Sequence, residues 1–284
     1  DMELYSHQKK IFQIYSKRAS INEFNETITS EIREIEKKIQ TLTIKMNKRT
    51  PDNRYLGDND EEEKEFYRNE KNKREAEKKD NSRYQEDIDV LNNKVNNLYS
   101  QYKTKVPSLV LYTAPTGTGK TLTPIGLATN NRIIFVCVAR HIGMALAKSA
   151  ISVEKKVAFG FGCETASDIR LHYFSAIDYK INVKSGGIGK VDHSNGNNVE
   201  IMICDVQSYL TCMHYMLAFN DANDIITYWD EPTITMDYEE HDMHKIIKNN
   251  WKNNKIPHVV LSCATLPSED ELKGVFEDFQ QNFE

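Results

Sequence analysis

A short apolar run that breaks into a glycine-rich turn is the feature that most constrains the fold of this chain. Residues 109–129 read LVLYTAPTGTGKTLTPIGLAT, so a strand-like run leads through the turn into a helix-like segment. The turn matches the pattern G-x-x-x-x-G-K-[ST], except that Ala114 stands at the first glycine position. Small residues there allow consecutive backbone N–H groups to face an anion beside the start of a helix. The sequence therefore predicts a phosphate-binding loop between a buried strand and the start of a helix, which is expected over residues 122–129.

The loop predicts particular nucleotide contacts. Lys120 is expected to reach the β- and γ-phosphates, and the Thr121 hydroxyl is expected to ligate Mg²⁺. The predicted nucleotide-binding residues of the loop are Thr116, Gly117, Thr118, Gly119, Lys120 and Thr121.

After residue 106, short apolar runs alternate with helical segments. The runs predicted to be strands span residues 109–112, 132–138, 156–160, 200–204, 225–229 and 258–262. Strands that alternate with helices favour an α/β fold with a mostly parallel sheet covered on both faces. The Gly/Asn/Ser-rich stretch 182–198 is predicted to be a long surface loop.

An acidic pair follows the fifth of these runs. Asp230 and Glu231 come directly after residues 225–229, and ligands gather at the carboxyl ends of strands in open α/β sheets. A phosphate-binding loop needs a carboxylate that holds Mg²⁺. The sequence therefore predicts that Asp230 positions the metal and that Glu231 polarises the attacking water.

Two apolar stripes precede the α/β block. In each stripe the apolar residues recur at intervals of three and four, which indicates a long amphipathic helix. The stripes consist of Ile21, Phe24, Ile28, Ile32, Ile35, Ile39, Leu42 and Met46, and of Tyr84, Ile88, Leu91, Val95, Leu98 and Tyr102. We predict that they bury one another in an antiparallel, coiled-coil-like helical hairpin. The alternative is two separate helices that pack on the globular block.

Composition narrows the classes of function. The net charge of −5 at pH 7 excludes a global basic field, so any nucleic-acid site has to be a local groove. The five cysteines form no C-x-x-C pair, which indicates a reducing compartment. There is no apolar run of about 18 residues and no charged-then-apolar leader at the N-terminus. We therefore expect no membrane span and an intracellular location, cytoplasmic or nuclear.

Six segments carry a family resemblance. In chain order they are LYSHQKKIF (4–12), APTGTGKT (114–121), FVCVARHIGMALAKSA (135–150), IMICDVQSYL (201–210), WDEPT (229–233) and LSCATLP (261–267). The first resembles the segment whose glutamine reads the adenine edge, and the others resemble motifs I, Ia, Ib, II and III of the superfamily 2 helicases and translocases, the DExD/H-box group. The resemblance covers roughly residues 1–15 and 106–284, which correspond to the first RecA-like domain of that family.

The resemblance implies an ATP-dependent helicase or translocase that binds ATP, Mg²⁺ and a single strand of DNA or RNA. It implies a catalytic role for Lys120, Asp230 and Glu231, adenine recognition by Gln8, and Mg²⁺ binding by Thr121 and Asp230. Residues implied to couple hydrolysis to strand movement are Thr233, Cys263 and Thr265. Candidate nucleic-acid contacts are Arg140, Lys148 and Gln207.

Three departures from the family pattern concern this coupling rather than ATP binding. Thr233 and Cys263 replace the usual residues of motifs II and III, and Asp205 stands where motif Ib often has Thr. An acid that faces a nucleic-acid phosphate would be unfavourable. The alternative function is therefore an ATP-gated P-loop interaction module without motor activity.

The resemblance also implies a domain organisation. Residues 1–20 would be the N-terminal glutamine-motif segment of the ATPase domain, residues 21–105 an inserted helical hairpin, and residues 106–284 the first RecA-like ATPase domain. In relatives, arginines of a second RecA-like domain complete the ATP pocket, and no such block follows here. We expect that C-terminal domain to be missing from this chain, weak hydrolysis by the chain alone, and a protein partner for the helical arm.

Overall fold

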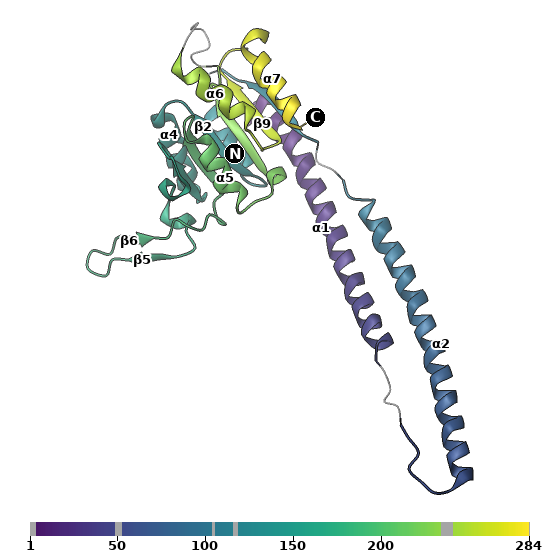
Figure 1. Cartoon of the computed structure of the whole chain (residues 1–284). Coiled ribbons are helices and arrows are strands. Elements are labelled where there is room, and N and C mark those ends of the chain that lie inside the picture. The colour runs from purple at the N-terminus through teal and green to yellow at the C-terminus, as the bar shows by residue number, and fades with distance from the viewer. Residues whose placement is uncertain (1–3, 49–52, 104–105, 116–118, 234–240, 284) are drawn as a thin grey trace. The chain divides into compact units, whose positions relative to one another are not determined.

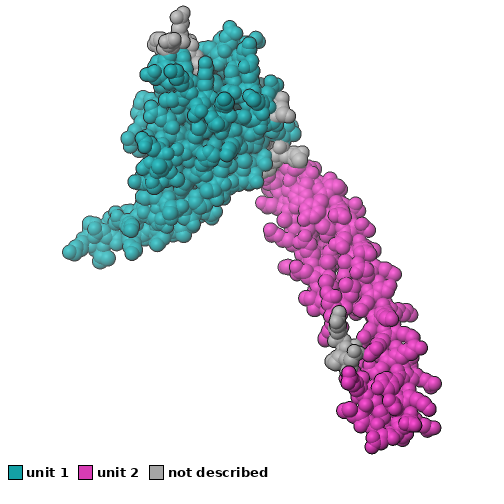
Figure 2. All heavy atoms as spheres, viewed as in Figure 1, with its two compact units in different colours: residues 1–19, 105–284 teal, residues 20–104 magenta. Residues whose placement is uncertain are grey.

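The chain folds into two units, shown in different colours in Figure 2. The computed structural model describes residues 4–48, 53–103, 106–115, 119–233 and 241–283. Unit 1 contains residues Asp1–Ala19 and Lys105–Glu284, and unit 2 contains residues Ser20–Thr104. Helix α1 (Ser6–Met46) begins in unit 1 and ends in unit 2.

A seven-stranded sheet forms the centre of unit 1 (Figure 1). Its strand order is β1-β9-β8-β2-β7-β3-β4, and every pair is parallel except the antiparallel pair of β3 with β4. The strands are β1 (Ser108–Thr113), β2 (Arg132–Cys137), β3 (Val157–Gly160), β4 (Arg170–Leu171), β7 (Ile201–Asp205), β8 (Ile225–Asp230) and β9 (His258–Cys263). The six parallel strands match the six predicted runs to within one residue at each end. The predicted α/β fold with a mostly parallel sheet is therefore confirmed.

Apolar clusters cover both faces of this sheet. Successive side chains of β2 point to opposite faces, so Ile134 joins one cluster and Phe135 the other. Helices α5 (Tyr209–Leu217), α6 (Asp242–Lys252) and α7 (Glu269–Phe283) contribute to the first cluster. Helices α3 (Thr123–Leu127), α4 (Arg140–Ser152) and the first turns of α1 contribute to the second. Burial on both faces explains why the central strands are almost continuously apolar.

The first turns of α1 are fixed against α3. Ile11 and Tyr15 are buried in the second cluster, and Phe12 lies against Gly126. A Cβ atom at Gly126 would lie 2.5 Å from the Phe12 ring, so only glycine permits this approach. The contact places the N-terminal segment beside residues 119–122, the described end of the predicted phosphate-binding loop.

The helix after that loop differs from the prediction. A 3₁₀ turn spans Lys120–Leu122, and α3 ends at Leu127. A helix therefore starts within the predicted stretch 122–129, but it also ends within that stretch. Pro124 lacks a backbone N–H and is tolerated only in a first turn, and Gly126 weakens the helix further.

A β-hairpin occupies part of the stretch that was predicted to be a loop. Strands β5 (Tyr179–Ile181) and β6 (Ile188–Val191) pair in antiparallel fashion and project from the body of unit 1 (Figure 1). The predicted loop over residues 182–198 is therefore wrong at residues 188–191. The turn is closed by bonds from the Asn182 amide to the Gly187 carbonyl and from the Gly186 amide to the Asn182 carbonyl. Residues 177–190 are all exposed, so the alternating burial pattern that marks a strand is absent there.

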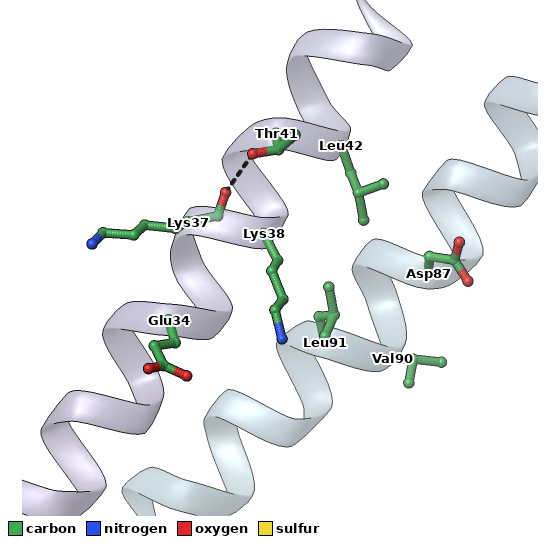
Figure 3. A pocket seen from close by; sticks show the side chains of 8 residues that line it. All are labelled: Glu34, Lys37, Lys38, Thr41, Leu42, Asp87, Val90 and Leu91. Carbon is green, nitrogen blue, oxygen red and sulfur yellow. Dashed lines mark hydrogen bonds between the residues drawn. The ribbon is translucent and has the colours of Figure 1, made fainter.

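In unit 2, α1 packs against α2 (Asp60–Tyr99) through an apolar cluster. Its buried members are Ile28, Ile32, Ile35, Val95 and Leu98. Asn25 bonds to Lys103, whereas the groove in Figure 3 brings residues 34–42 of α1 beside residues 87–91 of α2, so the helices run in opposite directions. That groove has a volume of about 660 Å³. The interpretation of this helix pair as an arm inserted into an ATPase domain stays a prediction.

Candidate functional site

Three neighbouring parallel strands deliver the predicted motifs to one edge of the sheet. Strand β9 lies between β1 and β8, with Thr113 beside Cys263 and Asp230 beside Ser262. The carboxyl ends of these strands lead into the phosphate-binding loop, the acidic pair and residues 263–265. This edge is where ligands bind in open α/β sheets.

Hydrogen bonds tie the three strand ends together. The Ala114 amide donates to the Cys263 carbonyl at 3.2 Å, and the Glu231 amide donates to the Ser262 carbonyl at 2.8 Å. Glu231 has a φ of 50°, a left-handed conformation that is uncommon for residues other than glycine. Its backbone bond to Ser262 holds this conformation, and a strained residue at such an edge is typical of a functional site.

Lys120 connects the loop to the acidic pair. Its ammonium donates a hydrogen bond to Glu231 Oε1 and lies 3.9 Å from Asp230 Oδ1. The Lys120 and Asp230 side chains are only 12% and 13% exposed. The structure thus brings together the three residues that were predicted to be catalytic. Other predicted residues of the loop, Thr116, Gly117 and Thr118, lie outside the described residues, as does the side chain of Thr121.

Burial dominates the electrostatics of the acidic pair. It raises the pKa of Asp230 to about 6, with a smaller contribution from the negative charge of Glu231 and an opposing one from Lys120. Burial also raises the pKa of the Cys263 thiol to about 11, and Glu231 adds to this effect. Cys263 is therefore a neutral thiol beside the acidic pair at neutral pH.

Gln8 links the N-terminal segment to the phosphate-binding loop. Its Nε2 donates to the Gly119 carbonyl at 3.1 Å, and its Oε1 accepts from the Tyr5 amide at 3.1 Å. Gly119 has a φ of 75°, and a Cβ atom there would lie 2.9 Å from Gln8 Nε2, so the position requires glycine. A glutamine amide has a second N–H and a second acceptor lone pair besides these bonds. Its predicted role in adenine recognition stays a prediction.

Two aromatic rings next to Gln8 were missed by the sequence analysis. The Tyr5 and His7 rings stack at a centroid distance of 5.4 Å, and His7 also contacts Tyr112 at 5.6 Å. Tyr5 and His7 lie within the segment LYSHQ, where two aromatic residues beside the glutamine were the available signal. Flat ring faces beside a glutamine amide suit a nucleotide base.

The structure places two of the three candidate nucleic-acid contacts at one edge of the sheet. Arg140 and Gln207 follow the adjacent parallel strands β2 and β7, so both lie at the same sheet edge as the acidic pair. Arg140 is exposed, and its guanidinium lies 5.3 Å from the centroid of the Phe161 ring. Lys148 is exposed further along α4, roughly 12 Å from Arg140 at 1.5 Å of helix rise per residue. The structure therefore groups Arg140 with Gln207 but not with Lys148.

Asp205 has a local structural function at this edge. Its two carboxylate oxygens accept hydrogen bonds from the Gly162 and Ser208 amides, each at 2.8 Å. These bonds join the loop after β3 to the start of α5. The carboxylate is thus directed at backbone donors of its own chain. Of the residues implied in coupling, Cys263 is buried, Thr233 is half-buried and Thr265 is exposed, and their coupling role stays a prediction.

Two further properties hold for the described part of the chain. It contains no group of three or more His, Cys, Asp or Glu side chains arranged to hold a metal ion. It also contains no helix with the length and apolar character needed to cross a membrane.

Comparison with known proteins gives structural similarity but no match at the level of sequence. Neither a protein-family model nor a curated protein matches the sequence. Among solved structures, the chain is similar to the Hef helicase domain of Pyrococcus furiosus, with 16% sequence identity and a TM-score of 0.36. The match covers 65% of this chain and 35% of the Hef chain, so this chain spans about a third of the length of that protein. The fold described above rests on strand order and register rather than on this overlap.

Proposed function

We propose that this chain is the N-terminal ATPase domain of a superfamily 2 helicase or translocase that binds ATP, Mg²⁺ and one strand of DNA or RNA. The observation that carries the proposal is the convergence of Lys120 with Asp230 and Glu231 at the carboxyl edge of a parallel sheet. A lysine from a phosphate-binding loop beside a strand-terminal acidic pair is the arrangement that phosphoryl transfer to water requires.

Each of the three side chains has a distinct role in this proposal. Lys120 moves its ammonium from the acidic pair to the β- and γ-phosphates, which have the higher negative charge. Glu231, whose left-handed backbone is held by Ser262, orients the attacking water and accepts its proton. Asp230 and Thr121 would supply the hard oxygen ligands that Mg²⁺ prefers, and the ion, when bound, would neutralise phosphate charge.

The nucleic-acid strand is proposed to cross the same sheet edge. Arg140 and Gln207 would contact phosphates and sugars rather than base edges, so we expect little sequence specificity. Thr233, Cys263 and Thr265 would connect hydrolysis to strand movement. A second RecA-like domain of the longer protein would donate the arginines that stabilise the transferring phosphoryl group.

The proposal is tested by ATP turnover of this chain and of the longer protein, each with and without single-stranded DNA or RNA. We expect stimulation by nucleic acid in the longer protein and weak turnover by this chain. Glu231→Gln should lower turnover about 10²- to 10⁴-fold while ATP still binds. Lys120→Ala should weaken ATP binding itself. The matched control is Lys155→Ala, which removes a comparable bridge to Glu200 of 3.3 Å and should leave ATP binding unchanged.

The outcomes separate the two candidate functions. ATP binding without stimulated hydrolysis in either protein would contradict the motor and support the ATP-gated interaction module. If neither this chain nor the longer protein binds ATP, both candidate functions are overturned.

A further inference from the structure

We propose that the β5–β6 hairpin and the aromatic residues at its base form a second contact site for a single-stranded nucleic acid. This inference rests on the proposed function, because it assigns a further part of the strand's path. The residues that form the site are Tyr173, Phe174, Tyr179, Lys180, Lys184 and Lys190.

The hairpin has a charge opposite to that of the whole chain. Residues 179–191, YKINVKSGGIGKV, include three lysines and no aspartate or glutamate, whereas the chain has a net charge of −5. Lys180 pairs directly with Lys190 across the two strands, so their side chains emerge on one face. Like charges in directly opposed positions destabilise a strand pair, and an anion bound between them would offset this repulsion.

Two acidic residues flank the hairpin, and they are fewer than its three lysines. Asp178 and Asp192 lie at its base, and the Asp192 carboxylate accepts bonds from the backbone N–H and hydroxyl of Ser194. These bonds are the main cause of the lowered pKa of Asp192, and the positive charges of His193 and Lys190 contribute to it. Asp192 therefore offsets part of the charge of Lys190, whereas its hydrogen bonds go to the turn that follows β6.

Exposed rings accompany the lysines. Tyr173, Phe174 and Tyr179 are 38%, 42% and 42% exposed. They form one cluster, since the Tyr173 ring lies 5.5 Å from Tyr179 and 6.5 Å from Phe174. Aromatic faces combined with cations are the means by which proteins hold single strands without reading sequence, because every base has a face that stacks. This combination favours a nucleic-acid strand over an acidic protein surface, which would offer the rings nothing to stack on.

The base of the hairpin is firmly attached to the sheet. The Leu171 amide of β4 donates to His193 Nδ1, and the Tyr215 hydroxyl of α5 donates to the His193 carbonyl, each at 3.0 Å. A projecting hairpin whose base is fixed in this way can bind a ligand on its exposed face.

A groove joins this base to the edge of the sheet that carries Gln207. It has a volume of about 1020 Å³, and its lining includes Arg170, His193, His214 and Phe219 but a single carboxylate, that of Glu164. Because β3 and β7 are parallel, the loop that contains Glu164 leaves the sheet at the same edge as Gln207. A strand could therefore pass from that edge, along the groove, to the hairpin.

The test measures the affinity of this chain for fluorescein-labelled oligo-dT and oligo-U by anisotropy over a series of salt concentrations. The two probes distinguish DNA from RNA as the source of the strand. A triple Lys→Gln variant at Lys180, Lys184 and Lys190 should bind about tenfold more weakly, and the slope of log affinity against log salt should fall by up to about 2. The matched control carries the same change at the exposed Lys245, Lys248 and Lys273 of α6 and α7 and should bind as the parent does.

A second pair of variants tests the rings. Tyr179→Ala should weaken binding about fivefold or more, whereas Tyr179→Phe, which keeps the stacking face, should not. All variants should retain parental affinity for a fluorescent ATP analogue, because the hairpin lies outside the nucleotide site.

The outcomes distinguish this inference from the proposed function. If the parent binds the oligonucleotides and the hairpin variants bind them equally well, the hairpin inference is overturned and the proposed function stands. If neither the parent nor the longer protein binds them with or without ATP, the proposed function fails and the inference fails with it.

Discussion

Burial raises the pKa of Asp230 to about 6, although the Lys120 ammonium lies 3.9 Å away. In the unfolded chain the same carboxyl titrates near 3.8. Between these values the folded state binds more protons than the unfolded state, so stability decreases as the pH rises through this window. At neutral pH the ionised Asp230 therefore destabilises the fold. A binding site that must attract a cation is expected to carry such a cost.

The first prediction follows from this decrease of stability with rising pH. Asp230→Asn should raise the melting temperature above that of the parent at about pH 7.5, and the difference should shrink as the pH falls through 6 toward about 4. Thermal unfolding without nucleotide or metal, followed by circular dichroism, measures this. The control is Asp168→Asn, which should be destabilising at neutral pH because amide and hydroxyl donors around Thr165 lower the pKa of Asp168. A parent that is more stable than Asp230→Asn at neutral pH would contradict the argument.

At the scale of residues, the sequence could indicate which residues are candidates for the site but not which contacts they make. Lys120, Asp230 and Glu231 belong to short motifs whose spacing is local, so they could be chosen from the sequence. The bond between Gln8 and Gly119 joins positions 111 residues apart and depends on how α1 packs on α3. The left-handed backbone of Glu231 is likewise set by its bond to Ser262 on another strand, which no local pattern encodes.

At the scale of elements, burial determines which parts were predictable. The six parallel strands are buried on both faces and therefore appear as continuous apolar runs. Strands β5 and β6 contact mainly each other and are exposed, so Gly186, Gly187 and the nearby asparagines outweighed their weak strand signal. Helix α3 starts where the sequence indicates, but Pro124 and Gly126 limit it to one short segment. Elements stabilised by the core are thus visible in the sequence, whereas those stabilised by a turn are not.

The second prediction compares two isoleucines of α1. Ile32 is 3% exposed within the cluster shared with α2, whereas Ile44 is 71% exposed. Ile32→Ala should destabilise unit 2 by about 2–4 kcal/mol, because it removes buried apolar area and leaves a cavity. Ile44→Ala should change stability by less than about 0.5 kcal/mol. Hydrogen exchange of the α1 and α2 amides, analysed by mass spectrometry, reports the local stability.

The comparison also tests whether the helices depend on their mutual contact. Faster exchange in both helices is expected for Ile32→Ala, since most of the stability of a helix in a protein comes from the packing of its apolar face. Equal exchange in the two variants would show that the cluster does not stabilise the pair.

At the scale of the whole molecule, the two ends of unit 2 lie beside each other. The Asn25 side chain donates to the Lys103 carbonyl at 2.9 Å and accepts from the Lys103 amide at 3.0 Å. The Lys103 ammonium also lies 4.3 Å from the centroid of the Phe24 ring. Each of the three apolar clusters is built from residues of a single unit. Separate cores and adjacent ends are what an inserted unit would require, and the insertion itself stays a prediction.

The last prediction removes most of unit 2. Residues 26–102 are replaced by a short Gly/Ser linker. Asn25 and Lys103 remain, so the hydrogen bonds between these two residues can still form. We expect the shortened chain to fold and to bind a fluorescent ATP analogue as tightly as the parent, because no core residue of unit 1 is lost and closing a short loop costs little entropy. Circular dichroism and an ATP-analogue titration measure the two properties, and Lys120→Ala should weaken binding in the shortened chain as it does in the parent. A folded shortened chain that no longer binds the analogue would mean that unit 2 helps to build the nucleotide site. If binding persists but stimulation by nucleic acid in the longer protein is lost, the helices of unit 2 act on the strand or on coupling, which separates their function from that of the ATP site.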